Sequence, residues 1–266
     1  MKNNTILLVI TFILAGLASC TGKKENNEEK ARKGWSLVWE DDFDESLDQA
    51  AWSKIPKAKL HSFRYMSGND ELYVFQDGNL VLRAMENVAA SDTMPFLTGG
   101  ITGRGITGNS VSRMEVRARM NPVQGATAYI SLLPSDKAKN ISIDIMERYG
   151  VDEFVYQSVT SEYTTTQGMP DNPPSSALVG VNPNEYHIYG VEKYPDSLVF
   201  FVDDIRTKKY PRILTDIPGQ FPFNDQDFNL YIGIRLDKDT DTTALPADML
   251  IDWVRFYEPF TPTTEK

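Results

Sequence analysis

The sequence predicts an all-β protein built as a sandwich of two antiparallel sheets. Short segments rich in β-branched and aromatic residues recur along the chain, and turn-forming residues separate them. We find no long amphipathic helical pattern between these segments. Many short strands without intervening helices are typical of two packed sheets rather than of an α/β domain. We therefore expect one β-rich domain, spanning residues 34–260.

The first 19 residues have the pattern of a secretory signal peptide. An apolar run from Ile6 to Leu17 follows Lys2, and Leu-Ala-Ser precedes Cys20. The run is too short to span a membrane as a helix. This pattern predicts that Cys20, the only cysteine, is lipidated after cleavage, which leaves no thiol for a disulfide or a metal. The alternative is a buried structural cysteine. We therefore expect an outer-membrane lipoprotein of a bacterial cell envelope, facing the periplasm or the outside.

Two flanking segments lack the pattern of folded structure. Residues 20–33 carry the lipidated cysteine and a Lys/Glu/Asn-rich stretch without apolar periodicity, which predicts a flexible tether. Residues 261–266 form a short C-terminal tail. The formal net charge of −10 argues against nucleic acid as a partner, because nucleic-acid binding depends on Lys and Arg that neutralise phosphates. Membrane contact is expected through the lipid only.

The first half of the domain contains five predicted strands, at residues 34–43, 71–75, 79–85, 112–120 and 125–134. Gln-Asp-Gly at 76–78 supplies a hairpin turn between the second and third. Residues 112–120 alternate strictly, with Met114 and Val116 on one face and Arg113 and Glu115 on the other, as in a half-buried antiparallel strand. That charged row either lines a cleft or faces solvent. Residues 61–70 are expected as a loop and the glycine-rich residues 99–108 as strands and turns.

The second half contains six predicted strands, at residues 141–147, 154–160, 185–192, 197–202, 229–235 and 248–257. A loop rich in Pro, Asn and Ser is expected at 168–176.

The segment from Asn140 to Gly150 concentrates carboxylates on a strand pattern. Isoleucines at 141, 143 and 145 recur with period two, so Ser142 and Asp144 share the opposite face. Glu147 is out of phase with them, and a β-bulge near Met146 is needed to bring it to the same face. The alternative is an edge strand whose carboxylates simply face water.

Ordered motifs along the domain resemble those of one enzyme family. They are Trp-Glu-Asp-Asp-Phe-Asp at 39–44, Asp-Gly-Asn-Leu at 77–80, Met-Glu-Val-Arg at 114–117, Ile-Asp-Ile-Met-Glu at 143–147, Tyr-His-Ile-Tyr at 186–189, Phe-Val-Asp-Asp at 201–204 and Ile-Asp-Trp-Val-Arg-Phe-Tyr at 251–257. Over residues 35–258 the chain resembles laminarinase-like members of glycoside hydrolase family 16. The resemblance implies a concanavalin A-like β-jelly roll with a glycan-binding cleft across its concave sheet.

The resemblance also implies roles for three residues of the central strand. The family pattern Glu-Ile-Asp-Ile-Met-Glu supplies a nucleophile, a supporting aspartate and a general acid/base, and Ser142, Asp144 and Glu147 occupy these positions here. Retaining hydrolysis needs two carboxyl groups roughly 5 Å apart. A serine hydroxyl brings no charge to the first position. Asp144 or a water molecule is left to replace the nucleophile, and the water route would make the enzyme inverting.

Further positions depart from the family pattern. Thr127 and Ser131 stand where the family has tryptophans that stack on sugars, Thr160 stands near the place of a histidine, and Tyr194 stands in place of another tryptophan. Tyrosines are able to stack on sugar rings, although each is equally suited to a core or surface position. The candidate substrate-binding residues are Thr127, Tyr129, Ser131, Tyr149 and Tyr194, with Tyr156 and Tyr163 as further tyrosines.

A structural calcium is the only metal that the resemblance implies, and no cofactor is expected to be required. The predicted ligands are Asp42, the carbonyl of Gly78 and Asp252, because calcium prefers hard oxygen ligands. Ordinary surface carboxylates are the alternative. His61 and His187 are the only histidines, too few for a histidine-based metal centre.

Three functions are compatible with these residues. The first is recognition of a β-linked polysaccharide or oligosaccharide with retaining hydrolysis weak or lost. The second is an active endo-β-glycosidase that uses Glu147 as its acid/base in a modified mechanism. The third is a structural lipoprotein that binds a protein partner.

Overall fold

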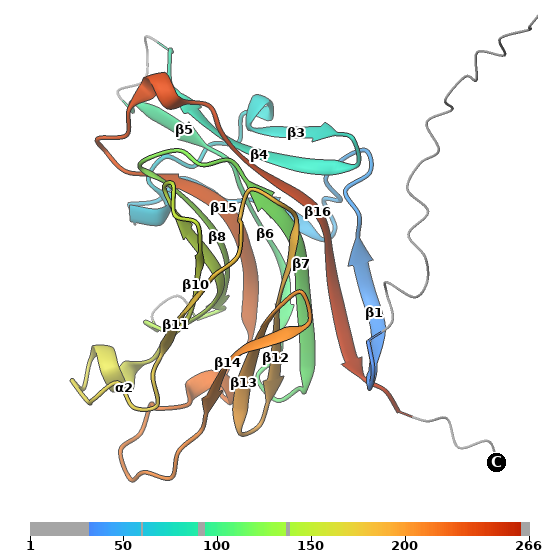
Figure 1. The fold of residues 1–266 in the computed structure, drawn as a ribbon, viewed down its shortest axis with the longest axis vertical. Coiled ribbons are helices and arrows are strands. Elements are labelled where there is room, and N and C mark those ends of the chain that lie inside the picture. Colours follow the sequence, from blue (N-terminus) through green and yellow to red (C-terminus); the bar gives the residue numbers. More distant parts are fainter. Residues whose placement is uncertain (1–31, 60, 90–93, 137–138, 262–266) are drawn as a thin grey trace, which may run out of the picture. The chain divides into compact units, whose positions relative to one another are not determined.

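Two antiparallel β-sheets pack face to face in the computed structural model, which describes residues 32–59, 61–89, 94–136 and 139–261 (Figure 1). The predicted all-β sandwich is confirmed. The predicted signal peptide, Cys20 and most of the tether lie outside the described residues. Within the described ranges, no helix has both the length and the hydropathy needed to cross a membrane.

The larger sheet has nine strands. Its members, in chain order, are β1 (Trp35–Asp41), β3 (Tyr73–Gln76), β4 (Asn79–Glu86), β5 (Phe96–Thr98), β7 (Ser112–Met120), β12 (His187–Tyr194), β13 (Ser197–Val202), β14 (Ile205–Pro211) and β16 (Ala247–Pro259). The predicted hairpin turn between β3 and β4 is confirmed, because Asp77 and Gly78 both have positive φ angles, of 53° and 69°, as a two-residue turn requires.

The smaller sheet has seven strands in the order β11-β10-β9-β8-β15-β6-β2. They are β2 (Trp52–Lys54), β6 (Gly100–Ile106), β8 (Ala126–Pro134), β9 (Ser142–Tyr149), β10 (Val155–Thr160), β11 (Ser176–Val179) and β15 (Phe228–Leu236). Figure 1 shows β8 and β15 bowed, so that the outer face of this sheet is concave. We call this outer face the cleft face.

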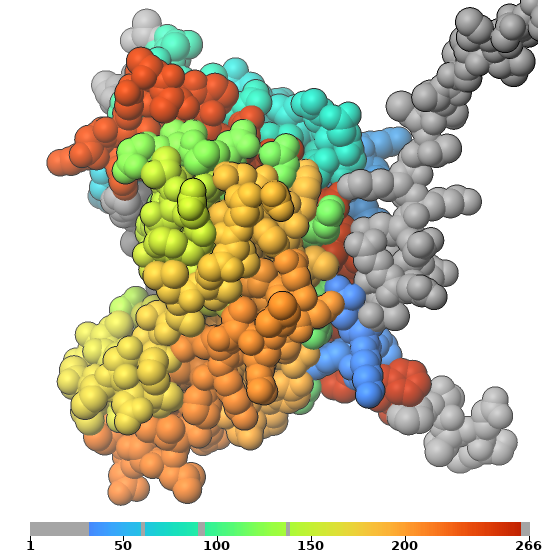
Figure 2. Space-filling view, in the orientation of Figure 1, coloured from blue at the N-terminus to red at the C-terminus, as the bar shows by residue number. Residues whose placement is uncertain are grey.

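Helical structure within the described ranges is limited to short pieces in the connections. They are η1 (His61–Phe63), η2 (Asp70–Leu72), α2 (Glu162–Thr165), η3 (Pro222–Asn224) and η4 (Thr242–Ala244). The segment around α2 lies beside the connection between β14 and β15 (Figure 2), where the Gln167 amide donates a hydrogen bond to the Pro218 carbonyl.

The inner faces of both sheets form one hydrophobic core. Alternation in β7 is confirmed, because Met114 and Val116 are fully buried against the other sheet. In the charged row of β7, Arg113 and Glu115 neither line the cleft nor face solvent, whereas Arg117 and Arg119 are half-buried on the outer face of the larger sheet. Arg113 and Glu115 are only 6% and 0% exposed, because they pair with each other and Arg113 also pairs with Glu192. Buried charges require such partners.

The folded domain begins slightly earlier than the sequence indicates. Arg32, predicted as tether, bridges to Trp35, and its guanidinium lies 2.8 Å from the Glu115 carboxylate. The buried Glu115 therefore fixes the start of the domain on the outer face of the larger sheet. Four strands were also missed. β2, β5 and β11 have only three or four residues, too few for a clear alternation, and β14 consists mostly of polar and charged residues.

Candidate functional site

A β-bulge in β9 brings the two predicted catalytic carboxylates to the cleft face. Ser131 of β8 pairs with Asp144, but the preceding Ile130 pairs with Met146, so two residues of β9 oppose one residue of β8. Ile145 and Met146 are consequently both buried in the core. The out-of-phase position of Glu147 predicted this bulge, and the prediction is confirmed.

Gln157 of β10 supports the bulge from within the core, a role for which no sequence pattern is a signal. Its side chain is fully buried, and its amide donates to the Ile145 carbonyl at 3.1 Å and to the Phe201 carbonyl at 3.2 Å. The Thr207 hydroxyl donates to its amide oxygen. These bonds link the bulge to β13 and β14 of the opposite sheet, so Gln157 holds the backbone that aims Glu147.

Asp144 lies in a group of serine hydroxyls. The hydroxyl of Ser142 donates to Asp144 Oδ2 at 2.7 Å and that of Ser158 at 3.2 Å, and Ser131 adds a third hydroxyl. Burial, and then the nearby charge of Glu147, raise the pKa of Asp144 from 3.8 to about 6, although the hydroxyls oppose this shift. Asp144 is therefore able to hold or release a proton near neutral pH.

Both oxygens of Glu147 accept hydrogen bonds. Arg235 of β15 donates to Oε1 at 3.0 Å, and the Tyr149 hydroxyl donates to Oε2 at 2.9 Å. Burial, and then the Glu147 carboxylate, raise the pKa of Tyr149 to about 12, so its hydroxyl stays a donor. Arg235 was not among the predicted site residues, although a charged residue at the end of an otherwise apolar strand is a usable signal. This arrangement fixes the Glu147 carboxylate beside the groove.

An open groove of about 470 Å³ lies next to these carboxylates and is lined by Glu147, Tyr149, Tyr156, Ser158 and Ser176. This volume falls within the range of about 300–1,000 Å³ that is usual for small-molecule sites. Tyr149 and Tyr156 touch edge to face, with ring centroids 5.1 Å apart. The groove thus offers aromatic rings for stacking and hydroxyls for hydrogen bonds, which suits a sugar.

Other predicted substrate contacts are placed differently. Thr127, Tyr129 and Ser131 lie on the cleft-face side of β8, but each is only 4–5% exposed. They form a covered floor and are not open contacts. Tyr194 is a correction, because it lies on the other sheet, where it contacts the Trp35 ring and donates to Glu192. Its position in β12 separates it from the groove, so it is not part of this site.

The three predicted calcium ligands lie on neighbouring strands of the larger sheet. The register pairs Asp41 with Val254 and Leu80 with Ile251, which brings Asp42 and the turn at Gly78 toward Asp252. The Asp252 carboxylate also forms an ion pair with the Arg117 guanidinium. This ion pair already neutralises part of the negative charge that would attract a calcium ion. Among the described residues, no three side chains of the His, Cys, Asp and Glu types form a metal-binding group. The calcium site remains a prediction.

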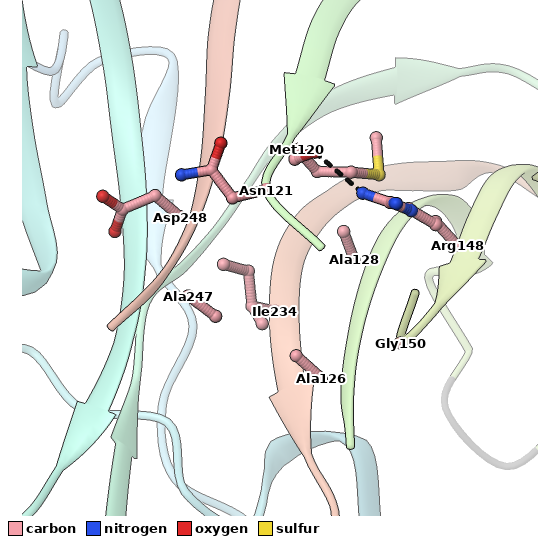
Figure 3. A pocket seen from close by; sticks show the side chains of 9 residues that line it. All are labelled: Met120, Asn121, Ala126, Ala128, Arg148, Gly150, Ile234, Ala247 and Asp248. Carbon is pink, nitrogen blue, oxygen red and sulfur yellow. Dashed lines mark hydrogen bonds between the residues drawn. The ribbon is translucent and has the colours of Figure 1, made fainter. Parts of the chain in front are cut away.

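A second cavity, of about 10 Å³, is lined by residues of both sheets (Figure 3). Its lining includes Met120, Ala128 and Arg148, and Arg148 donates to the Met120 carbonyl at 2.8 Å. This volume has room for about one water molecule. It is therefore a packing void and not a substrate site.

Comparison with known proteins identifies the family. The model of the glycosyl hydrolases family 16 matches residues 61–255. The chain belongs to glycoside hydrolase family 16. This membership confirms the resemblance and agrees with the jelly-roll fold.

Two curated relatives and one solved structure are similar to this chain. A β-glucanase of Rhodothermus marinus is 25% identical over 97% of this chain and 96% of its own length. A keratan-sulfate endo-1,4-β-galactosidase of Sphingobacterium multivorum is 26% identical over 91% of this chain and 59% of its own. The structure is a glutamate-to-serine variant of a non-specific endo-β-1,3(4)-glucanase, presenting a 1,3-β-D-cellobiosyl-glucose at its active site. It has a TM-score of 0.71 and 20% identity, and covers 85% of this chain and 96% of its own.

Proposed function

We propose that this domain recognises a β-linked polysaccharide or oligosaccharide in the groove beside Glu147, and that its retaining hydrolysis is weak or lost. One observation carries the proposal. Ser142 occupies the position that the resemblance assigns to the nucleophile, and its hydroxyl donates to Asp144 at 2.7 Å. A neutral hydroxyl used as a donor offers no negative charge to an oxocarbenium-like transition state.

The relatives support the substrate class. One acts on a β-glucan and another on a β-galactoside backbone, so both known activities concern β-linked chains. A glutamate-to-serine variant of a family member still holds an oligosaccharide at its active site. That neighbour shows that an exchange of this type is compatible with an occupied cleft.

Calorimetry tests the recognition step. We expect binding to at least one glycan in a panel of laminarin, mixed-linkage β-1,3(4)-glucan and keratan sulfate. A Tyr156→Ala variant removes a groove aromatic and should weaken that binding, whereas Phe260→Ala changes an aromatic that is 61% exposed after β16 and should not. Absence of binding to every member of the panel would contradict the proposal.

An active hydrolase is the second candidate, because the bulge brings Asp144 and Glu147 to the same face and the pKa of Asp144 is near 6. Restoring the carboxylate separates the two functions. Ser142→Glu should release oligosaccharides from the glycan that binds, whereas the uncharged Ser142→Gln should not. Release by the unchanged protein that is lost in Glu147→Gln would establish the modified hydrolase instead.

The predicted lipid anchor is part of the same proposal, because lipidation at Cys20 would hold the domain at the bacterial envelope, where extracellular or periplasmic glycans occur. Cys20→Ala should then move the protein from the membrane fraction to the soluble fraction. A role in binding a protein partner is less well supported, because the groove is open and lined by aromatic rings.

A further inference from the structure

The cleft face is open over one part and closed over the other. On the side of β9–β11, Tyr149 is 38% and Leu178 is 58% exposed. On the side of β8 and β15, the outward-facing Tyr129, Ser131 and Tyr231 are 4%, 5% and 8% exposed. All these residues lie on the same face of one sheet, so strand orientation does not explain the difference. Another segment of the chain must therefore cover the part formed by β8 and β15.

A second hydrophobic cluster provides this cover. Tyr129 and Tyr231 pack with Ile55 and Met66, and Phe63 and Leu133 add to the cluster. The Phe63 ring stacks on Tyr231, with centroids 5.7 Å apart and planes inclined by 21°. Ile55, Met66 and Phe63, the last residue of η1, therefore lie over the cleft face. We call this cluster the wall.

Backbone hydrogen bonds fix the wall in place. The Ile55 amide donates to the Gly100 carbonyl at 2.8 Å, and the Thr98 amide donates to the Tyr65 carbonyl at 2.8 Å. Tyr65 and Met66 are 7% and 2% exposed, so this end of the segment is packed into the domain. The wall is thus built with the strands and is not a loop resting on them.

Two glycines beneath the wall make room for it. A Cβ on Gly233 would lie 2.7 Å from the Tyr129 hydroxyl, and a Cβ on Gly100 would lie 2.9 Å from the Ile55 side chain and 3.0 Å from that of Met66. These distances are shorter than ordinary contacts. The absence of side chains at these two paired positions lets the covering side chains pack directly onto the sheet.

The groove consequently has one closed end. Its lining residues come from β9, β10 and β11, and the register aligns Ser176, Ser158 and Asp144 in one row across these strands. The next position in the row is Ser131, followed by Tyr231 under the Phe63 ring. A glycan that follows the row inward from β11 thus meets the wall directly beyond the carboxylates.

We propose that the groove receives the end of a β-linked glycan chain and excludes the interior of a polymer. This inference rests on the proposed glycan recognition and narrows its ligand to chain termini. A chain passing through the site would have to displace Phe63 from Tyr231, together with the hydrogen-bonded residues on either side of Phe63. A chain end requires no such displacement.

The stoichiometry of binding tests this inference. Size-fractionated laminarin and size-fractionated keratan sulfate are titrated calorimetrically into the protein. If chain ends bind, the amount of protein bound per gram of glycan halves when the mean chain length doubles, because the number of ends per gram halves. Protein bound per gram that stays constant with chain length would overturn the inference while leaving glycan recognition intact. No binding to these two glycans or to mixed-linkage β-1,3(4)-glucan would overturn both.

A wall variant provides a second readout. Phe63→Ala removes the ring stacked on Tyr231, and we expect it to raise the amount of protein bound to long fractions relative to short ones. Phe260→Ala is the matched control. It also removes a phenylalanine ring, but Phe260 is exposed and directly follows β16, a strand of the larger sheet. Equal length dependence for a folded Phe63→Ala variant and the original protein would show that Phe63 does not close the groove. The stoichiometry of the original protein decides the inference even if the variant fails to fold.

Discussion

Replacing Gln157 by leucine should strongly destabilise the domain, because this buried amide connects the β9 bulge to the opposite sheet. The change leaves the carbonyls of Ile145 and Phe201 and the hydroxyl of Thr207 without this partner. A buried polar group that loses its hydrogen bond costs about 1–3 kcal/mol. With three such groups, we expect the free energy of unfolding to fall by about 3–5 kcal/mol.

Urea unfolding followed by tryptophan fluorescence measures this loss. A Thr207→Val change in the Gln157→Leu background removes one unsatisfied hydroxyl, so it should recover about 1 kcal/mol. Gln167→Leu is the control, because Gln167 is exposed and bonds only one surface carbonyl through its side chain. It should change stability by less than about 0.5 kcal/mol. A loss below about 1 kcal/mol for Gln157→Leu would refute the structural role argued for this residue.

Three further predictions concern the cleft face. The pKa of Asp144 is raised to about 6 in the folded state, so the folded state holds this proton more tightly than the unfolded chain does. Urea titrations measure the free energy of unfolding of the original protein and of Asp144→Asn at each pH. The value for the original protein minus the value for the variant should fall as pH rises from about 4 through about 6. A rise in this difference would contradict the raised pKa of Asp144. The buried Tyr129 hydroxyl has no hydrogen-bond partner within the described part of the chain, so Tyr129→Phe should cost less than about 0.5 kcal/mol or stabilise the domain. Gly233→Ala should instead cost about 1–3 kcal/mol in thermal or urea unfolding, and a smaller cost in a Tyr129→Leu background would confirm the steric cause.

The sequence by itself determined much of the framework. Strict alternation in β7 identified its core face, because successive side chains of a strand point to opposite sides. Asp-Gly at 77–78 determined the β3–β4 turn, because this pair tolerates the positive φ angles that such a turn needs. The phase of Glu147 relative to Asp144 required the bulge, since two carboxylates separated by three positions do not share a face of a regular strand.

Only the tertiary structure decided what covers each outer face. Period-two patterns place Tyr129 and Ser131 on the side opposite the core, but they do not show that Ile55, Phe63 and Met66 cover that side. The same limit applies to Arg113 and Glu115 of β7, which are buried by ion pairs with groups distant in sequence. Strand alternation depends on neighbouring residues, whereas exposure of an outer face depends on contacts between segments far apart in the chain. For that reason the sequence located the carboxylates, and the packed structure showed which side of them is open to a glycan.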